Sequence, residues 1–503
     1  MSSRVETTTD IRFLAIVVFV VGAASLGTEI AAARLLAPYF GASTIVWANI
    51  IGVVLVALAV GYWLGGRFAD RHPSLRGLCA IVMLAAVLLA FVPFAARPFL
   101  GVSIDALASI EAGAFLGSLL GVLVLVSVPV MLLGAAAPYA LRLAVTDVER
   151  SGEVAGRLYA ISTGGSLVGT MLAALFLIPF AGTQRTFLTF AVALGVVGSL
   201  GLGPRFLVVP ALLGALTLLT VGAIKGAGDG HVLFETETPY QYARVVEHAG
   251  GERVLELNEG QAVHSVYEPG SYLTGNYWDG FLVLPFAASG PPPRRVLMLG
   301  SAAGTVARAY GHFFPGTWFD AVEIDGELTT IGRRYFDLRN PRMQTYTEDA
   351  RPFLATDDRR YDVIMVDAYR QPYVPFYLVT REFFGRVREH LAVGGSVIVN
   401  VGHPEGNDDL ERVVGRTMAA VFPVVRRDPI EPLNTLLTAS VGPVSAASLR
   451  DARGSLPPEL RRLGNEVAGE IGPRLPGGEI YTDDRAPVEW LVDLSILGYA
   501  NEK

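Results

Sequence analysis

Acidic residues follow successive short apolar segments in the second half of the chain. Glu323, Asp349 and Asp367 each stand at or just after the end of such a segment. A carboxylate can accept hydrogen bonds from ribose hydroxyls or from the amino group of a base. Acids that follow three successive segments form a far more specific pattern than any one of them alone. They predict a site that holds a nucleoside-bearing ligand.

A glycine-containing turn precedes these acids. Gly300 and Gly304 enclose the sequence Ser-Ala-Ala directly after the apolar run 296–299. Glycine permits a tight turn and a close approach of a ligand to the backbone. An acid about 20 residues later, here Glu323, is where a carboxylate can grip two ribose hydroxyls. The glycine pattern is sparser than that of a dinucleotide-binding fold, and so it favours an S-adenosyl-type ligand over NAD.

The other two acids have structural interpretations as well as chemical ones. The side chain of Asp349 and the backbone amide of Ala350 are placed to read the edge of an adenine. Asp349 also precedes a predicted helix, which it could simply cap. Asp367 could likewise be a helix cap or an ordinary loop carboxylate, although its position after the fourth predicted strand favours a role in the site.

Alternating strands and helices must position these residues. The strands predicted from about residue 291 onward are 296–299, 318–324, 343–346, 363–366 and 396–401, with a helix over about 380–391. This alternation predicts a doubly wound, Rossmann-like α/β domain of the S-adenosylmethionine-methyltransferase type, whose ligands bind at the carboxyl ends of the strands. Residues 231–260 alternate polar and apolar residues around Gly250-Gly251 and predict a small N-terminal β-hairpin region.

The first half of the chain has the composition of a membrane protein. Hydrophobic residues make up 51% of the sequence, charged residues 17%, and the mean hydropathy is +0.44. A bilayer core of roughly 30 Å requires about 20 apolar residues per helix. Seven spans are predicted by this measure, with Pro129 and Pro138 as possible kinks in the fourth. The predicted spans are 11–36, 44–65, 77–99, 113–140, 158–181, 185–203 and 206–224.

These patterns predict a multi-pass transmembrane domain over 1–228, a small β-rich region over 229–290 and an α/β catalytic domain over 291–503. The expected location is the cell (inner) membrane. The distribution of arginines places the N-terminus inside, and seven spans would then put the α/β domain outside, so its side of the membrane stays open. Glu29 lies within the first predicted span. It is either a functional group or a structural residue that hydrogen-bonds to a neighbouring helix. The net charge of −7 offers no basic face for nucleic acid.

Residues from about 230 to 400 resemble the spermidine synthase (polyamine aminopropyltransferase) family, and the whole chain resembles its membrane-fused branch. Glu237-Thr-Pro-Tyr-Gln241 is similar to the family's first motif, and Tyr277-Trp-Asp279 to its Tyr-His-Glu segment. Gly300 to Gly304 corresponds to its glycine-rich loop. Segments 61–71 and 482–489 are similar to those of membrane-fused members.

The resemblance implies transfer of an aminopropyl group from decarboxylated S-adenosylmethionine (or use of S-adenosylmethionine itself) to a small amine such as putrescine, with no metal. It implies that Asp367 is the general base, with Tyr369 and Gln371 beside the amine substrate. The expected partners also include the lipid bilayer and a second copy of the chain in a homodimer, but no nucleic acid. The nucleoside-binding residues that it implies are Gln241, Tyr277, Gly300, Gly304, Glu323, Asp349 and Ala350.

Three positions depart from the family pattern. Ala303 and Gln371 stand where the family carries acids that hold cationic amines, and Trp278 stands where it carries histidine. The nucleoside pocket is therefore expected to be kept and the amine site to be altered. Two other functions stay open, the first because of these missing acids and the second because of Glu29 and the seven predicted spans. One is a methyltransferase-like enzyme that uses S-adenosylmethionine on another acceptor. The other is a transporter or sensor whose second domain binds a nucleoside or polyamine.

Overall fold

The chain forms two compact units in the computed structural model. One unit contains Met1–Gly226 and Glu237–Tyr242, and the other contains Ala227–Thr236 and Ala243–Lys503. Each is described by itself below. The residues that the structure describes are 10–40, 44–107, 113–219, 229–258, 263–288, 290–369, 374–403, 405–488 and 491.

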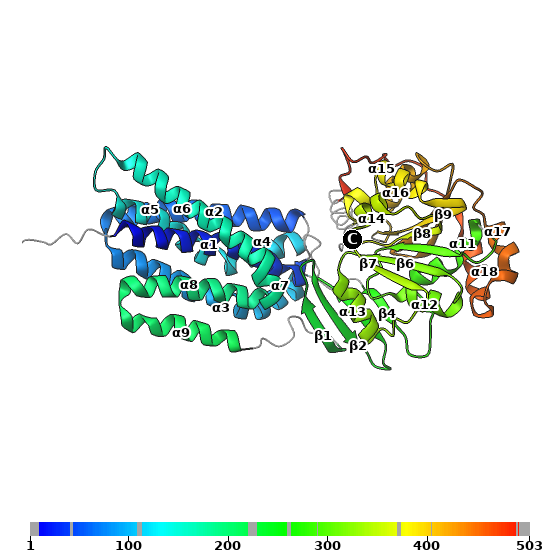
Figure 1. Ribbon diagram of the computed structural model, residues 1–503, viewed down its shortest axis with the longest axis horizontal. Coiled ribbons are helices and arrows are strands. Elements are labelled where there is room, and N and C mark those ends of the chain that lie inside the picture. The colour runs from blue at the N-terminus through cyan, green and yellow to red at the C-terminus, as the bar shows by residue number, and fades with distance from the viewer. Residues whose placement is uncertain are drawn as a thin grey trace, which may run out of the picture. The chain divides into compact units, whose positions relative to one another are not determined.

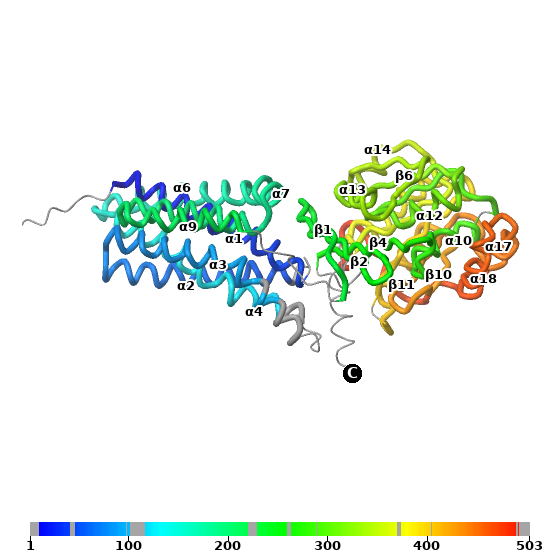
Figure 2. Tube along the Cα trace, turned by 90° about the horizontal axis from the view of Figure 1, so that it is seen from below, coloured from blue at the N-terminus to red at the C-terminus, as the bar shows by residue number. Residues whose placement is uncertain are grey.

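The first unit is a bundle of apolar helices that run side by side in both views (Figure 1, Figure 2). Small residues allow close packing, since a Cβ added to Gly165 or Gly169 would collide with the backbone oxygens of Phe19 and Ala23. The helices are α1 (Ile11–Phe40), α2 (Thr44–Arg71), α3 (Leu75–Leu107), α4 (Gly113–Leu125), α5 (Ser127–Ala144), α6 (Ser151–Leu172), α7 (Ile178–Ala181), α8 (Thr183–Leu202) and α9 (Val208–Ala215).

Among the described residues, six helices are long and apolar enough to cross a membrane, where seven were predicted. The predicted span at 206–224 is a shorter apolar segment, Pro204–Leu218, as far as the described residues extend. The predicted span at 113–140 is divided between α4 and α5. The division falls at Val126, three residues before Pro129, whose missing N–H removes a hydrogen bond of a continuous helix. Pro138 lies inside α5 without dividing it.

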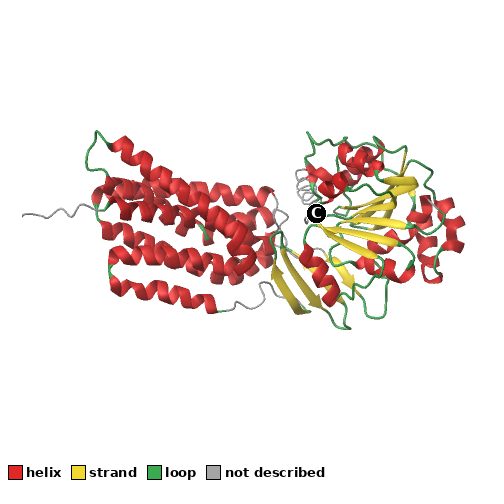
Figure 3. Ribbon diagram, in the orientation of Figure 1, coloured by secondary structure: helices red, strands yellow, loops and turns green. Residues whose placement is uncertain are grey.

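The second unit has a mixed eight-stranded sheet among its described residues, in the order β12-β10-β11-β9-β8-β5-β6-β7 (Figure 3). The pairs from β9 through β8, β5 and β6 to β7 are parallel, and those of β11 with β9 and β10 are antiparallel. The strands are β5 (Arg295–Leu299), β6 (Trp318–Glu323), β7 (Met343–Thr347), β8 (Tyr361–Val366), β9 (Leu391–Gly402), β10 (Val424–Glu431), β11 (Asn434–Ser440) and β12 (Gly472–Pro473).

Helices cover both faces of this sheet, which confirms the predicted doubly wound α/β architecture (Figure 1). Residues of β5 alternate between two apolar cores: Val296 and Met298 lie in one, and Leu297 and Leu299 in the other. The helices are α10 (Gly280–Val283), α11 (Pro285–Ala288), α12 (Thr305–Phe313), α13 (Gly326–Tyr335), α14 (Ala350–Thr356), α15 (Arg381–Glu389), α16 (Asp409–Ala419), α17 (Ala446–Asp451) and α18 (Arg461–Glu470).

The strand order sets the place of the site. After β5 the chain adds β6 and β7 on one side, and then returns to add β8 on the other side of β5. Loops that leave the carboxyl ends of β5 and β8 therefore diverge to opposite sides of the sheet and leave room for a ligand between them.

The predicted hairpin region is a separate four-stranded sheet with the order β1-β2-β3-β4. Its strands are β1 (His231–Glu237), β2 (Tyr242–Glu247), β3 (Arg253–Leu257) and β4 (Val263–Tyr267). Gly250 and Gly251 join β2 to β3 with φ angles of 99° and 87°, a conformation that favours glycine. The turn predicted at these glycines is thereby confirmed.

Candidate active site

Asp367 lies at the carboxyl end of β8, against the turn that follows β5. A Cβ on Gly300 would lie 2.5 Å from the backbone oxygen of Asp367, and the φ of Gly300 is 83°. Only glycine fits both the space and the conformation at this point. The backbones at the start of these two loops are therefore in close contact at Gly300 and Asp367, before the loops diverge.

The Asp367 carboxylate is buried among hydrogen-bond donors. Asn400 Nδ2 donates to Oδ1 at 2.8 Å, and the Tyr277 hydroxyl donates to Oδ2 at 3.1 Å. Burial raises the pKa of Asp367 to about 6, although the hydrogen bonds from Asn400, Tyr277 and Trp278 oppose that shift. Residues 367–369 are not helical, so Asp367 does not cap a helix among the described residues. A buried carboxylate with this pKa is suited to accept a proton near neutral pH.

A short helical turn, Tyr277–Asp279, brings the tyrosine to this carboxylate. Asp279 fixes the turn by accepting hydrogen bonds from the backbone amides of Thr274 and Gly275, at 3.0 Å and 2.8 Å. Burial and the neighbouring Asp367 raise the pKa of Tyr277 well above its usual value, so its hydroxyl stays protonated and donates. Tyr277, predicted to bind the nucleoside ligand, therefore contacts the predicted base.

Glu323 closes the glycine-containing turn from the neighbouring strand. Its Oε2 accepts hydrogen bonds from the backbone amides of Ser301 and Ala302, at 3.1 Å and 2.8 Å, and its Oε1 accepts one from Asp325 at 3.1 Å. Burial raises the pKa of Glu323. Each oxygen has a second lone pair that can accept a further hydrogen bond. Glu323 therefore both orders the turn and retains acceptor capacity toward a ligand.

Asp349 caps helix α14, which is one of the two roles that the sequence allows for it. Its Oδ1 accepts a hydrogen bond from the backbone amide of Arg351 at 2.9 Å, at the start of α14. Its Oδ2 accepts one from the Tyr377 hydroxyl at 2.7 Å. Ala350 is the first residue of α14 and is buried. Both predicted adenine-reading residues thus lie at the carboxyl end of β7, in the same row of strand ends as Glu323 and Asp367.

Residues 284–447 match the family model of the spermine/spermidine synthase domain. Over these residues the domain that holds this site is similar to the spermine/spermidine synthase family. The matched segment includes every strand of the sheet except β12, and it contains Gly300, Glu323, Asp349 and Asp367. The resemblance found in the sequence is thereby confirmed for the α/β domain.

Two curated relatives match part of the chain. A probable polyamine aminopropyl transferase of Bifidobacterium longum (strain NCC 2705) is 35% identical over 195 residues, 39% of this chain and 43% of that protein. A polyamine aminopropyltransferase of Vibrio vulnificus (strain CMCP6) is 32% identical over 136 residues, 26% of this chain and 46% of that protein. The chain therefore spans less than half the length of these two relatives.

Solved structures are also similar to part of this chain. A probable spermidine synthase from Corynebacterium glutamicum ATCC 13032 is 20% identical, with a TM-score of 0.40. The match covers 51% of this chain and 98% of that chain.

Three further residues predicted for the site have different outcomes. The Tyr369 hydroxyl donates to the backbone oxygen of Asn400 at 3.0 Å and accepts from the amide of Gly402, so it is occupied by β9. Gln371 lies outside the described residues. Gln241 belongs to the helical unit, where its backbone hydrogen-bonds with Thr238 in a tight turn. Its predicted contact with a nucleoside ligand stays a prediction.

The departures from the family pattern change the charge of the site. The methyl group of Ala303 is fully buried in an apolar cluster with Leu255 and Leu328, and its backbone amide donates to Ser265 Oγ at 3.0 Å. Position 303 therefore contributes no charge. Trp278 is buried and contacts Asp367 by a side-chain hydrogen bond. A tryptophan can only donate, so Trp278 stabilises the charged carboxylate as a neutral donor.

Asn400 is a site residue that the sequence interpretation missed. It lies on β9, donates to Asp367, and accepts a hydrogen bond from Asn434 Nδ2 of β11 at 3.0 Å. An amide in the otherwise apolar run Val397-Ile-Val-Asn-Val401 is the signal that could have identified it, since a buried polar group needs partners. The role of Asn434 had no such signal, because β11 reaches the site only through long-range pairing with β9.

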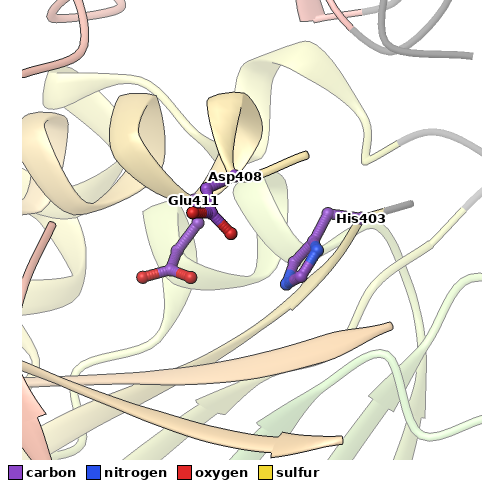
Figure 4. A group of neighbouring side chains, drawn as sticks. All are labelled: His403, Asp408 and Glu411. Carbon is purple, nitrogen blue, oxygen red and sulfur yellow. The ribbon is translucent and has the colours of Figure 1, made fainter. Parts of the chain in front are cut away.

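His403, Asp408 and Glu411 form a second group of side chains beyond the end of β9 (Figure 4). One ligand atom from each lies within 4.8 Å of the others, a spacing that could hold a metal ion. Glu411 is completely buried, however, and both of its oxygens are paired with Arg427, at 2.6 Å and 2.8 Å. A guanidinium in this position neutralises the carboxylate and repels a cation, so the chemistry of the group does not fit a metal site.

Proposed function

We propose that the chain is a membrane-bound aminopropyltransferase of the spermidine synthase type, with decarboxylated S-adenosylmethionine as donor and a small amine such as putrescine as acceptor. The observation that carries this proposal is the buried Asp367 carboxylate, with its pKa of about 6 and its donors Tyr277 and Asn400, in a domain of this family. A general base of this pKa suits an amine nucleophile, which must lose a proton to react.

In the proposed reaction the amine nitrogen attacks the propyl carbon next to the donor's sulfonium sulfur. A nitrogen–carbon bond forms as the carbon–sulfur bond breaks, and the sulfur leaves with its bonding electrons as neutral methylthioadenosine. Before the attack, Asp367 removes a proton from the ammonium group of the acceptor, and the resulting neutral amine is the nucleophile. The positive sulfur already activates the electrophile, so the protein contributes mainly orientation and proton removal.

Tyr277 and Asn400 hold the base in place for this step. Tyr277 keeps its proton, and the amide of Asn400 presents its nitrogen to Asp367 because its oxygen is occupied by Asn434. Both donors therefore stabilise the carboxylate form that accepts the proton. Glu323, Asp349 and Ala350 are proposed to hold the ribose and adenine of the donor, and Gly300 and Gly304 to let its chain pass close to the backbone.

The helical unit is proposed to lie in the cell membrane. Apolar side chains such as Val56, Leu175 and Phe180 are 64%, 58% and 82% exposed, which suits a lipid environment rather than water. The six candidate spans of the described residues would return the chain to its starting side, and arginines flank the loops after the second and fourth spans. The α/β domain would then face the cytoplasm. Protease added outside sealed, right-side-out vesicles should spare it, and its digestion there would contradict this orientation.

The function is tested with the purified full chain and a panel of amines. Incubation with decarboxylated S-adenosylmethionine should release methylthioadenosine only when an acceptor amine is present. The parallel incubation with S-adenosylmethionine should release no S-adenosylhomocysteine. Turnover of S-adenosylmethionine without methylthioadenosine release would instead assign the domain to methyl transfer, and turnover of neither donor would point to a binding domain.

A further inference from the structure

Segment 481–488 is an ordered turn whose two ends are fixed in the α/β unit. Tyr481 and Val488 are 3% and 0% exposed and lie in one of the two apolar cores that flank the sheet. Between them the backbones of Thr482 and Arg485 exchange two hydrogen bonds, at 3.1 Å and 3.0 Å. The segment is therefore a defined part of the domain, although the proposed reaction makes no direct use of it.

Asp483 lies in this turn and accepts hydrogen bonds from two other segments. Arg351 Nη2 donates to its Oδ1 at 2.6 Å, and Arg351 Nη1 donates to its Oδ2 at 3.0 Å. The Thr380 hydroxyl also donates to Oδ1, at 2.7 Å, and itself accepts from Arg351 Nη2 at 3.0 Å. The bonds from Arg351 are the main reason that the pKa of Asp483 lies below its usual value. Two parallel bonds between a guanidinium and a carboxylate fix the orientation of both groups.

Both partners of this carboxylate lie beside the proposed nucleoside site. Arg351 directly follows Asp349 and Ala350, which are proposed to hold the adenine. Thr380 caps the start of α15, where its hydroxyl accepts from the backbone amide three residues later at 3.2 Å. Tyr377, three residues before Thr380, donates to Asp349 at 2.7 Å. The start of α14 is therefore joined to the chain before α15 both directly and through the 481–488 segment.

We infer that Asp483 is a positioning residue for the nucleoside of the donor, because it holds the starts of α14 and α15 together at the adenine side of the site. This inference rests on the proposed function and deepens it, since it makes donor affinity depend on the 481–488 segment. Asp483 acts through Arg351 and Thr380. A carboxylate suits this role because both of its oxygens accept, whereas an amide would turn an NH2 group toward the guanidinium.

The test measures donor binding by the purified full chain. Asp483→Asn should raise the KM for decarboxylated S-adenosylmethionine and the Kd for methylthioadenosine by about threefold to tenfold, since these bonds join charged groups but are partly screened by water. The kcat at saturating donor and the melting temperature should stay near those of the wild type. Asp484→Asn is the matched control, because it removes the same charge from the adjacent exposed residue, and it should bind the donor as the wild type does.

Arg351→Lys gives a second measurement that does not depend on the Asp483 variant folding. It keeps the positive charge but cannot form two parallel bonds, so it should also raise the KM for the donor. The double variant Asp483→Asn/Arg351→Lys should raise this KM no further than the stronger single variant, because the two residues act as one unit.

Two results would overturn the assignment of Asp483 while leaving the transferase activity standing. One is a donor KM that stays at the wild-type value in Asp483→Asn or in Arg351→Lys. The other is a double variant in which the two single effects multiply. If the wild type neither binds methylthioadenosine nor releases it with any amine, the proposed function itself is rejected.

Discussion

The two units of this chain differ in how closely their backbones approach and in what their surfaces expose. In the helical unit Gly165 and Gly169 pack against the backbone of α1, and large apolar side chains such as Phe180 are exposed although Phe187 is buried. In the α/β unit large apolar side chains such as Phe319 and Phe336 fill the core. Glycine allows helices to approach where no hydrophobic effect drives them together, whereas large apolar side chains stabilise a core by leaving water.

This difference indicates the surroundings for which each unit is suited. Ionisable groups follow the same division. The α/β unit concentrates buried carboxylates with donors at the ends of its parallel strands, and the helical unit has Glu29 as an acid within a span. We therefore assign the chemistry to the α/β unit and the lipid contact to the helical unit. The predictions below test that division, from the largest expected effect to the smallest.

Removal of the proposed base should have the largest effect. Asp367→Asn should reduce kcat by about 10²–10⁴-fold, the usual contribution of a general base. Binding of methylthioadenosine should remain, because the nucleoside contacts are made by other residues. Glu29→Gln, which removes the acid within the first span, should leave the transfer rate near that of the wild type. Comparable losses in both variants would break the assignment of chemistry to one unit.

The second-largest effect is expected from a lysine in place of an exposed valine, which should be costly in the helical unit and harmless in the α/β unit. Val56 in α2 is 64% exposed, and Val393 in the α/β unit is fully exposed. Val56→Lys should disfavour membrane insertion by about 2.5–3.5 kcal/mol, the cost of a charge near the centre of a span. Val393→Lys should change the free energy of unfolding by less than about 0.5 kcal/mol. Insertion of the first variant as efficient as that of the wild type would argue against lipid at α2.

The glycine contacts of the helical unit can be tested by replacing a glycine with a larger residue. A side chain at Gly169 meets the backbone of Ala23, which cannot move aside, whereas nothing lies within 4 Å of a Cβ at Gly164. Gly169→Leu should destabilise the helical unit by about 1–3 kcal/mol in thermal unfolding in detergent. Gly164→Leu should not destabilise it. Equal unfolding temperatures for the two variants would show that close helix packing is not what stabilises this unit.

The smallest effect is expected in the pH dependence of kcat/KM for the proposed reaction. Since Asp367 must be deprotonated to act as base and burial raises its pKa to about 6, kcat/KM should fall as the pH drops below about 6. Asn400→Leu removes a hydrogen bond that lowers this pKa, so the midpoint should move to higher pH. Thr438→Val, a change on the same sheet away from Asp367, should leave the midpoint in place. A shift toward lower pH in Asn400→Leu would contradict the role of Asn400.

Much of the α/β unit could be predicted because its information is local. Short apolar runs specify buried parallel strands, and the acids at their ends lie together because parallel strands end at one edge of a sheet. Glu323, Asp349 and Asp367 were found in this way. Among the described residues six spans are found where seven were predicted, because the apolar segment 204–218 is too short there to be counted as a span.

The remaining parts of the site depend on contacts between distant segments. Asn434 reaches it through the antiparallel strand β11, whose pairing with β9 no local pattern specifies. The carboxylates also have partners that the sequence does not reveal, such as Tyr377 on Asp349 and the turn amides on Glu323. Sequence pattern therefore located the acids, and the structure showed which protein donors hold them.

The central claim is that the α/β unit transfers an aminopropyl group, and it can be tested by following that group. Decarboxylated S-adenosylmethionine labelled with deuterium in its propyl chain would be incubated with the purified full chain and putrescine, and the products analysed by mass spectrometry. We predict that the label appears in the amine product, in an amount equal to the methylthioadenosine released. Label that remains with the nucleoside, while the amine is unmodified or methylated, would contradict the account.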